Sequence, residues 1–187
     1  MVRVVMVGAP GSGKSRVAAA LARQLGWHHL DLDREIERRA GRSIAEIFGS
    51  EGESAFRQME AEVTDAVALV ERVVVAPGGG WITNPALLPR LKEGARVVWL
   101  SASLDTLLAR LGASPVVRPL LATPDPRSTL QRLLVEREPV YLAAADLVVP
   151  TDGRSVREIV AEIVADCQAS ATGQRLSVDD DGPTIDD

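Results

Sequence analysis

Cysteine is almost absent from this sequence, which holds one, Cys167, among its 187 residues. One cysteine excludes an internal disulfide and any metal site built from several cysteines, and it is typical of proteins from a reducing compartment. Long apolar runs are also missing, since none approaches the roughly 20 residues of a membrane-spanning helix. Residues 1–8 are too short and too rich in valine for a secretory signal. We therefore expect a cytoplasmic protein with no membrane partner.

A positive excess is missing as well. The formal net charge is −5. Residues 168–187 hold five Asp and one Arg and so contribute −4 to this charge. The rest of the chain carries about −1 and is therefore close to neutral. A nucleic-acid-binding protein would show a basic surface, and we expect no nucleic-acid partner. We predict one domain over residues 1–167 and a disordered acidic tail over residues 168–187, and we expect a monomer.

Short valine-rich segments alternate with segments of helical composition along the chain. The predicted strands lie at residues 2–7, 28–32, 72–76, 95–100 and 146–149. The predicted helices lie at residues 15–26, 33–41, 53–69, 84–91, 103–111, 127–138 and 155–167, and one more begins at the capping box of Ser43 and Glu46. This alternation predicts an α/β fold, a three-layer sandwich in which helices flank a five-stranded parallel sheet.

Proline and glycine mark three further features. Asn84 and Pro85 are expected to cap and begin one helix, and Pro139 is expected to end another. Residues 112–124 are rich in proline and have no periodicity, which predicts a mobile lid. In parallel sheets, ligands bind beyond the carboxyl ends of the strands. The residues that follow each strand are therefore the candidate site.

Lysine is nearly as scarce as cysteine, because the 21 basic residues are 19 Arg and two Lys. One lysine lies in the pattern Gly8-x-x-x-x-Gly13-Lys14-Ser15, which is the phosphate-binding loop. Its glycines let backbone N–H groups surround a phosphate, and a slim ammonium suits such a loop better than a planar guanidinium. Rather than a glycine-rich turn that holds lysine by chance, we predict a P-loop that binds nucleotide phosphates and Mg²⁺, formed by Gly11, Ser12, Gly13, Lys14, Ser15 and Arg16.

Two aspartates, Asp31 and Asp33, follow the second predicted strand. In strand geometry they share one face. One of them can hold Mg²⁺ through water, and the other can accept a proton from a substrate hydroxyl. The alternative for Asp33 is a helix cap with no chemical role.

Arg57 lies four residues after Glu53 and three before Glu60, so the three side chains share a helical face. Either they form a surface ladder of salt bridges, or Arg57 holds an anionic substrate while Glu60 orients it. The glycines at residues 78–80 follow the third strand and form either a flexible turn or a place where a ligand approaches the backbone.

Two more arginines have an ordinary and a functional interpretation. Arg118, in the expected lid, is either solvated or neutralises a transferring phosphoryl group. Arg137 is either a helix-end residue favoured by the helix dipole or a second clamp for an anion.

Together these segments resemble the shikimate kinase family. The matching segments run in order from Gly8 to Ser155 and read GAPGSGKS, DLDREIE, GRSIAEIF, GESAFRQME, PGGG, VVRPLL, REPVY and TDGRS. The phosphate loop is common to many kinases, whereas the other elements in this order are far more specific. The resemblance implies a small kinase of aromatic amino acid biosynthesis that transfers the γ-phosphoryl group of ATP to the 3-hydroxyl of shikimate.

The resemblance also implies a role for each candidate residue. Lys14 and Ser15 would serve the phosphates and Mg²⁺, with Asp31 behind the metal through water. Asp33 would bind the ring hydroxyls and act as the base. Arg57 and Arg137 would hold the substrate carboxylate, and Gly78, Gly79 and Gly80 would lie against the ring. The catalytic lid residue Arg118 would contact the transferring phosphoryl group. Arg110 and Arg154 would lie near the adenine.

Trp81 departs from the family pattern, in which a small residue usually follows the glycines. If Trp81 faces the pocket, the substrate is altered or the site is narrowed. If Trp81 packs against a helix, nothing changes.

Three alternatives to this function remain to be weighed. A kinase for another hydroxylated carboxylic acid, such as a gluconate kinase, does not explain the Gly-Gly-Gly and Arg-Pro-Leu-Leu elements. A GTPase switch would need guanine-reading motifs such as Asn-Lys-x-Asp, which the sequence lacks. A binding protein without activity is disfavoured because no predicted catalytic position has been lost.

The lysine of the phosphate loop provides the first testable prediction. Lys14→Arg should fold normally and lose nearly all phosphoryl transfer, because the charge is kept and the geometry is not. Circular dichroism and the release of ADP measure the two effects. Near-normal turnover in this variant would contradict the role that we give to the lysine.

Overall fold

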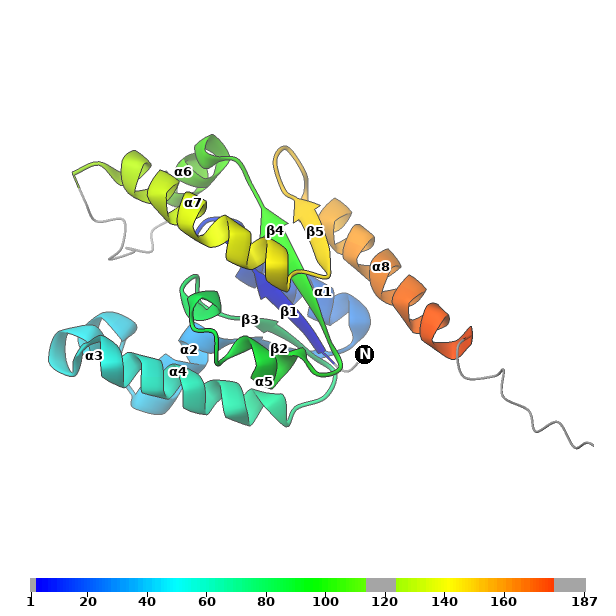
Figure 1. The fold of residues 1–187 in the computed structure, drawn as a ribbon, viewed down its shortest axis with the longest axis horizontal. Helices are drawn as coiled ribbons and strands as arrows, with labels where there is room; N and C mark the ends of the chain where they lie inside the picture. The colour runs from blue at the N-terminus through cyan, green and yellow to red at the C-terminus, as the bar shows by residue number, and fades with distance from the viewer. Residues whose placement is uncertain (1–2, 114–123, 177–187) are drawn as a thin grey trace, which may run out of the picture.

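A five-stranded parallel sheet forms the centre of the computed structural model, which describes residues 3–113 and 124–176 (Figure 1). The strand order is β2-β3-β1-β4-β5, and every pairing is parallel. The α/β fold and its five-stranded sheet are therefore confirmed. The strands are β1 (Arg3–Val7), β2 (His28–Asp31), β3 (Val73–Ala76), β4 (Ala95–Ser101) and β5 (Leu147–Pro150).

Helices cover both faces of this sheet. A short 3₁₀ helix, η1 (Trp81–Thr83), follows the glycines after β3. The α-helices are α1 (Lys14–Leu25), α2 (Leu32–Ala40), α3 (Ile44–Ser50), α4 (Gly52–Ala68), α5 (Leu88–Lys92), α6 (Leu104–Gly112), α7 (Pro126–Ala144) and α8 (Val156–Leu176). In the part of the chain that is described, none of them is both long and apolar enough to cross a membrane.

Alternation along β1 divides the core between the two faces, because successive side chains of a strand point in opposite directions. Val5 and Val7 belong to an apolar cluster with buried residues of α2, α3, α4, α5 and α7. Val4 and Met6 belong to a second cluster with buried residues of α1 and α8. The sheet is thus the middle layer of three.

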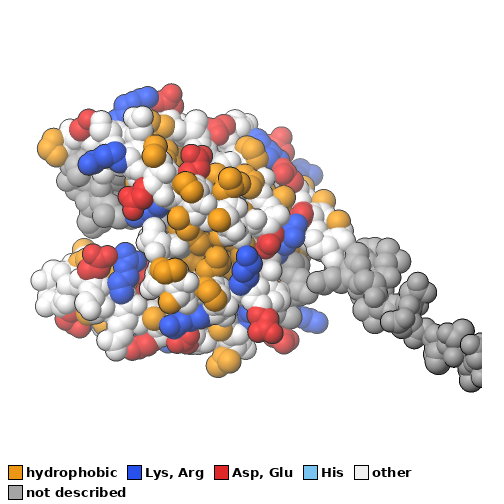
Figure 2. All heavy atoms as spheres, in the orientation of Figure 1, with side chains coloured by type: hydrophobic (Ala, Val, Ile, Leu, Met, Phe, Trp, Pro, Cys, Tyr) orange, Lys and Arg blue, Asp and Glu red, His pale blue; other side chains and the backbone are white. Residues whose placement is uncertain are grey.

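The carboxyl ends of the strands meet at one edge of the sheet. In Figure 1 this edge faces the space between α3 and α4 on one side and α6 and α7 on the other. Figure 2 shows the surface hollowed in the same place. The predicted lid, residues 112–124, lies outside the described residues except for its two ends, and α6 ends at Gly112.

One helix begins later than the sequence predicts. Asn84 does not cap a helix, because its side chain accepts a hydrogen bond from the Ala86 backbone N–H at 3.1 Å, two residues further on. Such local turns compete with helix formation. Consequently, α5 begins at Leu88 rather than at Pro85.

Pro139 does not end its helix, because α7 continues to Ala144. The predicted end of this helix is therefore wrong as well. A proline inside a helix removes a backbone hydrogen bond. Here the residues beyond it are buried in the core, with Tyr141 1% exposed and Ala144 4% exposed. Burial of these side chains outweighs the missing hydrogen bond.

The last helix is longer than predicted. It continues beyond Cys167 to Leu176, so the beginning of the predicted tail is helical. The added residues include alanine and glutamine, which favour helices, and no proline. Residues 177–187 of the predicted tail lie outside the described part of the chain.

Arg3, at the start of β1, is 6% exposed and holds two helix ends by hydrogen bonds to backbone carbonyls. Its guanidinium donates to the Ala68 carbonyl at 2.6 Å and to the Glu93 carbonyl at 2.8 Å. Ala68 is the last residue of α4, where the helix dipole attracts a positive charge.

Arg3→Met should therefore lower the free energy of unfolding by about 1–3 kcal/mol, because two partly buried carbonyls lose a charged donor. The urea midpoint should fall while the slope of the transition stays the same. Arg157→Met, at an exposed position of α8, is the control. An unchanged midpoint in Arg3→Met would mean that these hydrogen bonds contribute nothing net.

Candidate active site

The phosphate loop connects β1 to α1 in a conformation that only glycine adopts easily. Gly8 has φ 147°, and a Cβ at this position would lie 2.6 Å from the Leu100 carbonyl oxygen. Lys14 folds back along the loop, and its ammonium donates to the carbonyls of Gly8 at 2.9 Å and Ala9 at 3.1 Å. The lysine thus lies along the loop, as its slim shape predicted.

A hydroxyl and a carboxylate meet beside this loop. The Ser15 hydroxyl donates to Asp31 Oδ2 at 2.6 Å. The other Asp31 oxygen accepts from the Arg34 backbone N–H at 3.2 Å and caps α2. The two residues that the resemblance assigns to Mg²⁺ are thus in direct contact, and Asp31 has a structural task in addition.

Asp33 differs from its predicted geometry. The strand β2 ends at Asp31, and Asp33 lies in the first turn of α2, so the two aspartates do not share a strand face. Asp33 is not the helix cap either, since Asp31 takes that position. Its carboxylate lies against Gly78, where a Cβ would overlap it. The change from strand to helix thus sends the two carboxylates to different partners.

The glycine loop, defined here as residues 78–80, is approached closely by side chains from three parts of the chain. A Cβ at Gly79 would lie 3.3 Å from the Pro10 side chain, and a Cβ at Gly80 would lie 3.3 Å from Arg57 Nη2. Together with Asp33 beside Gly78, these contacts bring the phosphate loop, α2 and α4 to one short backbone segment. Its lack of side chains is what allows the approach.

Arg57 is held by two carboxylates of very different exposure. Its guanidinium donates to Glu60 at 2.9 Å and to Glu53 at 3.0 Å. The Glu60 side chain is 2% exposed and that of Glu53 is 66% exposed. Burial raises the pKa of Glu60, the Arg57 hydrogen bond opposes this shift, and the charge of Asp33 adds to it. The three residues are thus more than a surface ladder, because the carboxylate of Glu60 is buried.

On the opposite side, α7 holds the glycine loop through one carbonyl. Arg137 Nη1 donates to the Gly79 carbonyl at 2.6 Å, and the Tyr141 hydroxyl donates to the same oxygen at 3.3 Å. Burial raises the pKa of Tyr141, which keeps the hydroxyl protonated as a donor. The sequence prediction missed Tyr141. The signal was its position one turn after Arg137, hidden by the expectation that Pro139 ends the helix.

Trp81 packs against a helix instead of facing a pocket. It is fully buried, and its indole N–H donates to the Thr64 hydroxyl of α4 at 2.9 Å. The open question about Trp81 is thus answered, and the site is not narrowed by its ring.

Two other predicted arginines lie together near the end of β5. Arg110 donates to the Thr151 hydroxyl at 2.9 Å and to the Thr151 carbonyl at 2.8 Å. Arg154 donates to the Pro150 carbonyl at 3.0 Å and to Glu162 at 2.6 Å. Both guanidiniums are fixed on the same loop. Arg16 is exposed in the first turn of α1, and Arg118 lies outside the described residues.

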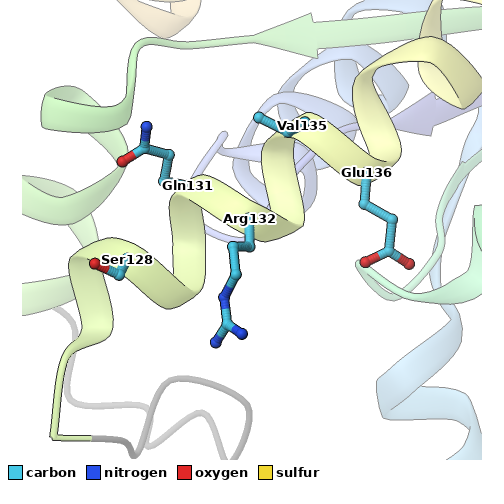
Figure 3. A pocket seen from close by; sticks show the side chains of 5 residues that line it. All are labelled: Ser128, Gln131, Arg132, Val135 and Glu136. Carbon is cyan, nitrogen blue, oxygen red and sulfur yellow. The ribbon is translucent and has the colours of Figure 1, made fainter.

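A separate hollow of about 420 Å³ runs along the exposed side of α7 (Figure 3). Arg137 and Tyr141, which reach the glycine loop from the same helix, do not line this hollow. The described residues that line it are Ser128, Gln131, Arg132, Val135 and Glu136.

Comparison with known proteins relates this geometry to a family. The model of the family "Shikimate kinase" matches residues 10–168. The chain belongs to the shikimate kinase family. The shikimate kinase of Symbiobacterium thermophilum is 42% identical over 166 residues, which are 88% of this chain and 95% of that protein. The shikimate kinase of Moorella thermoacetica is 42% identical over 86% of this chain and 91% of its own length.

Solved shikimate kinases have the same fold. The enzyme from Acinetobacter baumannii, in complex with shikimate, superposes with a TM-score of 0.85 at 34% identity, covering 91% of this chain and 94% of that one. The Aquifex aeolicus enzyme gives 0.76 at 32% identity, covering 91% and 99%. A gluconokinase from Sinorhizobium meliloti gives 0.58 at 19% identity, covering 95% and 97%, and shares the fold alone.

Membership of the shikimate kinase family makes this chain a kinase that uses ATP as the phosphoryl donor. The matched residues 10–168 include Asp33, Arg57, the glycine loop and Arg137. The family that the sequence motifs indicated is thereby confirmed.

Proposed function

We propose that this chain transfers the γ-phosphoryl group of ATP to the 3-hydroxyl of shikimate, which yields shikimate 3-phosphate and ADP. The observation that carries the proposal is the meeting of Arg57, Arg137 and Asp33 around the glycine loop. A carboxylated polyol needs cationic donors at its carboxylate and an acceptor at its hydroxyls. This arrangement supplies both within one small region.

Arg57 and Arg137 hold the substrate carboxylate in this proposal. Arg57 keeps its buried partner Glu60, whereas its bond to the exposed Glu53 is weak, as surface ion pairs are. A substrate carboxylate replaces Glu53 and leaves Glu60 in place. Gly78, Gly79 and Gly80 let the ring lie against the backbone.

Asp33 orients the ring hydroxyls and accepts the proton of the 3-hydroxyl. The oxygen of the 3-hydroxyl forms a bond to the γ-phosphorus. At the same time the bond between the γ-phosphorus and the β,γ-bridging oxygen breaks, and ADP leaves. Most of the catalysis in such a transfer comes from positioning and charge stabilisation. Lys14 and the lid residue Arg118 stabilise the charge on the transferring group.

The residues of the phosphate loop fit a nucleotide with Mg²⁺. Ser12 Oγ is buried and has no hydrogen-bond partner among the described residues, which suits a phosphate oxygen. The hydroxyl of Ser15 and the carboxylate of Asp31 are the hard oxygen ligands that Mg²⁺ prefers, the latter through water. When bound, the ion neutralises charge on the phosphates. Gly11, Gly13, Lys14 and Arg16 serve the phosphates.

The guanidiniums of Arg110 and Arg154 lie together near the end of β5 and are proposed to flank the adenine. A single cysteine suits the reducing cytoplasm, and the nearly neutral body gives no reason to add a nucleic-acid or membrane partner.

Release of ADP, coupled to NADH oxidation, tests the proposal with shikimate and gluconate as acceptors. We expect turnover with shikimate and only background with gluconate, and phosphorus NMR should identify shikimate 3-phosphate. Equal rates with gluconate, or none with shikimate, would contradict the proposed substrate.

Asp33→Asn keeps the size and one acceptor oxygen but cannot take the proton. Loss of a general base typically lowers turnover by about 10²–10⁴-fold, and we expect a decrease in that range. The shikimate KM should change modestly and the ATP KM little. Turnover within a few-fold of the parent would show that another group acts on the acceptor hydroxyl.

Asp31→Asn should raise the Mg²⁺ concentration needed for half-maximal activity. Asparagine caps helices as well as aspartate does, so the fold should be kept. The matched control is Asp125→Asn, because Asp125 caps α7 in the same way, through the Ser128 backbone N–H. An equal Mg²⁺ requirement in both variants would argue against a metal role for Asp31.

A further inference from the structure

Trp81 joins the glycine loop to α4 through a chain of buried hydrogen bonds. Its indole N–H donates to the Thr64 hydroxyl at 2.9 Å. The same hydroxyl donates to the Glu60 backbone carbonyl at 2.7 Å. Both side chains are 0% exposed, so solvent does not replace either partner. The residue directly after Gly80 is thereby fixed to the helix.

That helix carries Arg57 and its buried partner Glu60. Arg57 lies beside Gly80, where a Cβ would be 3.3 Å from its guanidinium. The bond between Trp81 and Thr64 therefore connects the glycine loop to the helix that carries Arg57. On the other side, the Gly79 carbonyl is held from α7 by Arg137.

The backbone of η1 extends this anchor into the loop. The Trp81 backbone N–H donates to the Gly78 carbonyl at 3.1 Å, and the Thr83 N–H donates to the Gly80 carbonyl at 3.1 Å. A shift of the indole would therefore move both ends of the glycine loop. A small residue at position 81 would not reach Thr64 at all.

We infer that Trp81 is a positioning residue, whose bond to Thr64 fixes the glycine loop at the spacing from Arg57 that the acceptor requires. The inference rests on the proposed shikimate kinase activity. Neither Trp81 nor Thr64 contacts the substrate directly, since both side chains are buried. They act through the backbone of the loop and through Arg57.

Thr64→Val tests the bond, because valine keeps the shape and removes the hydroxyl. The shikimate KM should rise about tenfold, with kcat and the ATP KM within about twofold, as expected when binding is lost equally in the ground and transition states. Thr64→Ser retains the hydroxyl and should stay within about threefold of the parent. Trp81→Phe, which loses the N–H, should behave like Thr64→Val and replaces it if that variant does not fold.

Val67→Ala is the matched control for stability. Val67 is 2% exposed, lies on the same helix and belongs to the same apolar cluster. This variant should melt at a lower temperature and keep the parent's shikimate KM. The inference is overturned if Thr64→Val keeps the parent's KM, if Val67→Ala raises the KM as much, or if Thr64→Ser behaves like valine.

Hydrogen exchange of the backbone amides at residues 78–83, measured without substrate, separates this inference from the proposed function. Exchange there should be faster in Thr64→Val than in Val67→Ala. If exchange behaves so and the parent does not phosphorylate shikimate, only the proposed function fails. If the parent is active and Thr64→Val keeps both the slow exchange and the shikimate KM, only the inference fails.

Discussion

The site depends on three consecutive residues that have no side chain. At residues 78–80 the backbone lies so close to Asp33, Pro10 and Arg57 that a Cβ at any of them would meet a neighbour within 3.3 Å or less. Parallel strands bring their carboxyl ends to one edge, but this alone leaves ordinary loops several ångströms apart. Because the glycines have no side chains, the phosphate loop, α2, α4 and α7 all contact this one short segment.

Charge balance in this region depends on a carboxylate that is nearly free of solvent. Burying Glu60 has a cost, as the upward shift of its pKa indicates, and the hydrogen bond from Arg57 offsets that cost. Glu53 binds the same guanidinium at the surface. The two partners therefore have separate effects: the buried one fixes where Arg57 lies, and the exposed one leaves room for exchange with an external anion.

The sequence predicted those features that local chemistry determines. Valine-rich strands and the phosphate loop are recognised from a few adjacent residues. Predictions failed where distant packing overrode a local rule. Pro139 does not end α7, because Tyr141 beyond it is buried against the core. Asp33 does not continue β2, because Asp31 already caps the next helix. Tyr141 was missed as a consequence of the first error, and no local signal showed that Trp81 points into the core.

Trp81 shows how one short segment meets two opposite demands. A loop that lets neighbours approach must have little side-chain volume, yet a loop without side chains has nothing of its own to pack and has high conformational freedom. In this chain the residue directly after the glycines is the largest of the fully buried side chains. The Trp81 side chain is buried in the core next to the loop. Its apolar area and its hydrogen bond to Thr64 therefore restrict the motion of the loop backbone. The backbone of residues 78–80 thus stays accessible from the cleft, while packing in the core keeps it in one conformation.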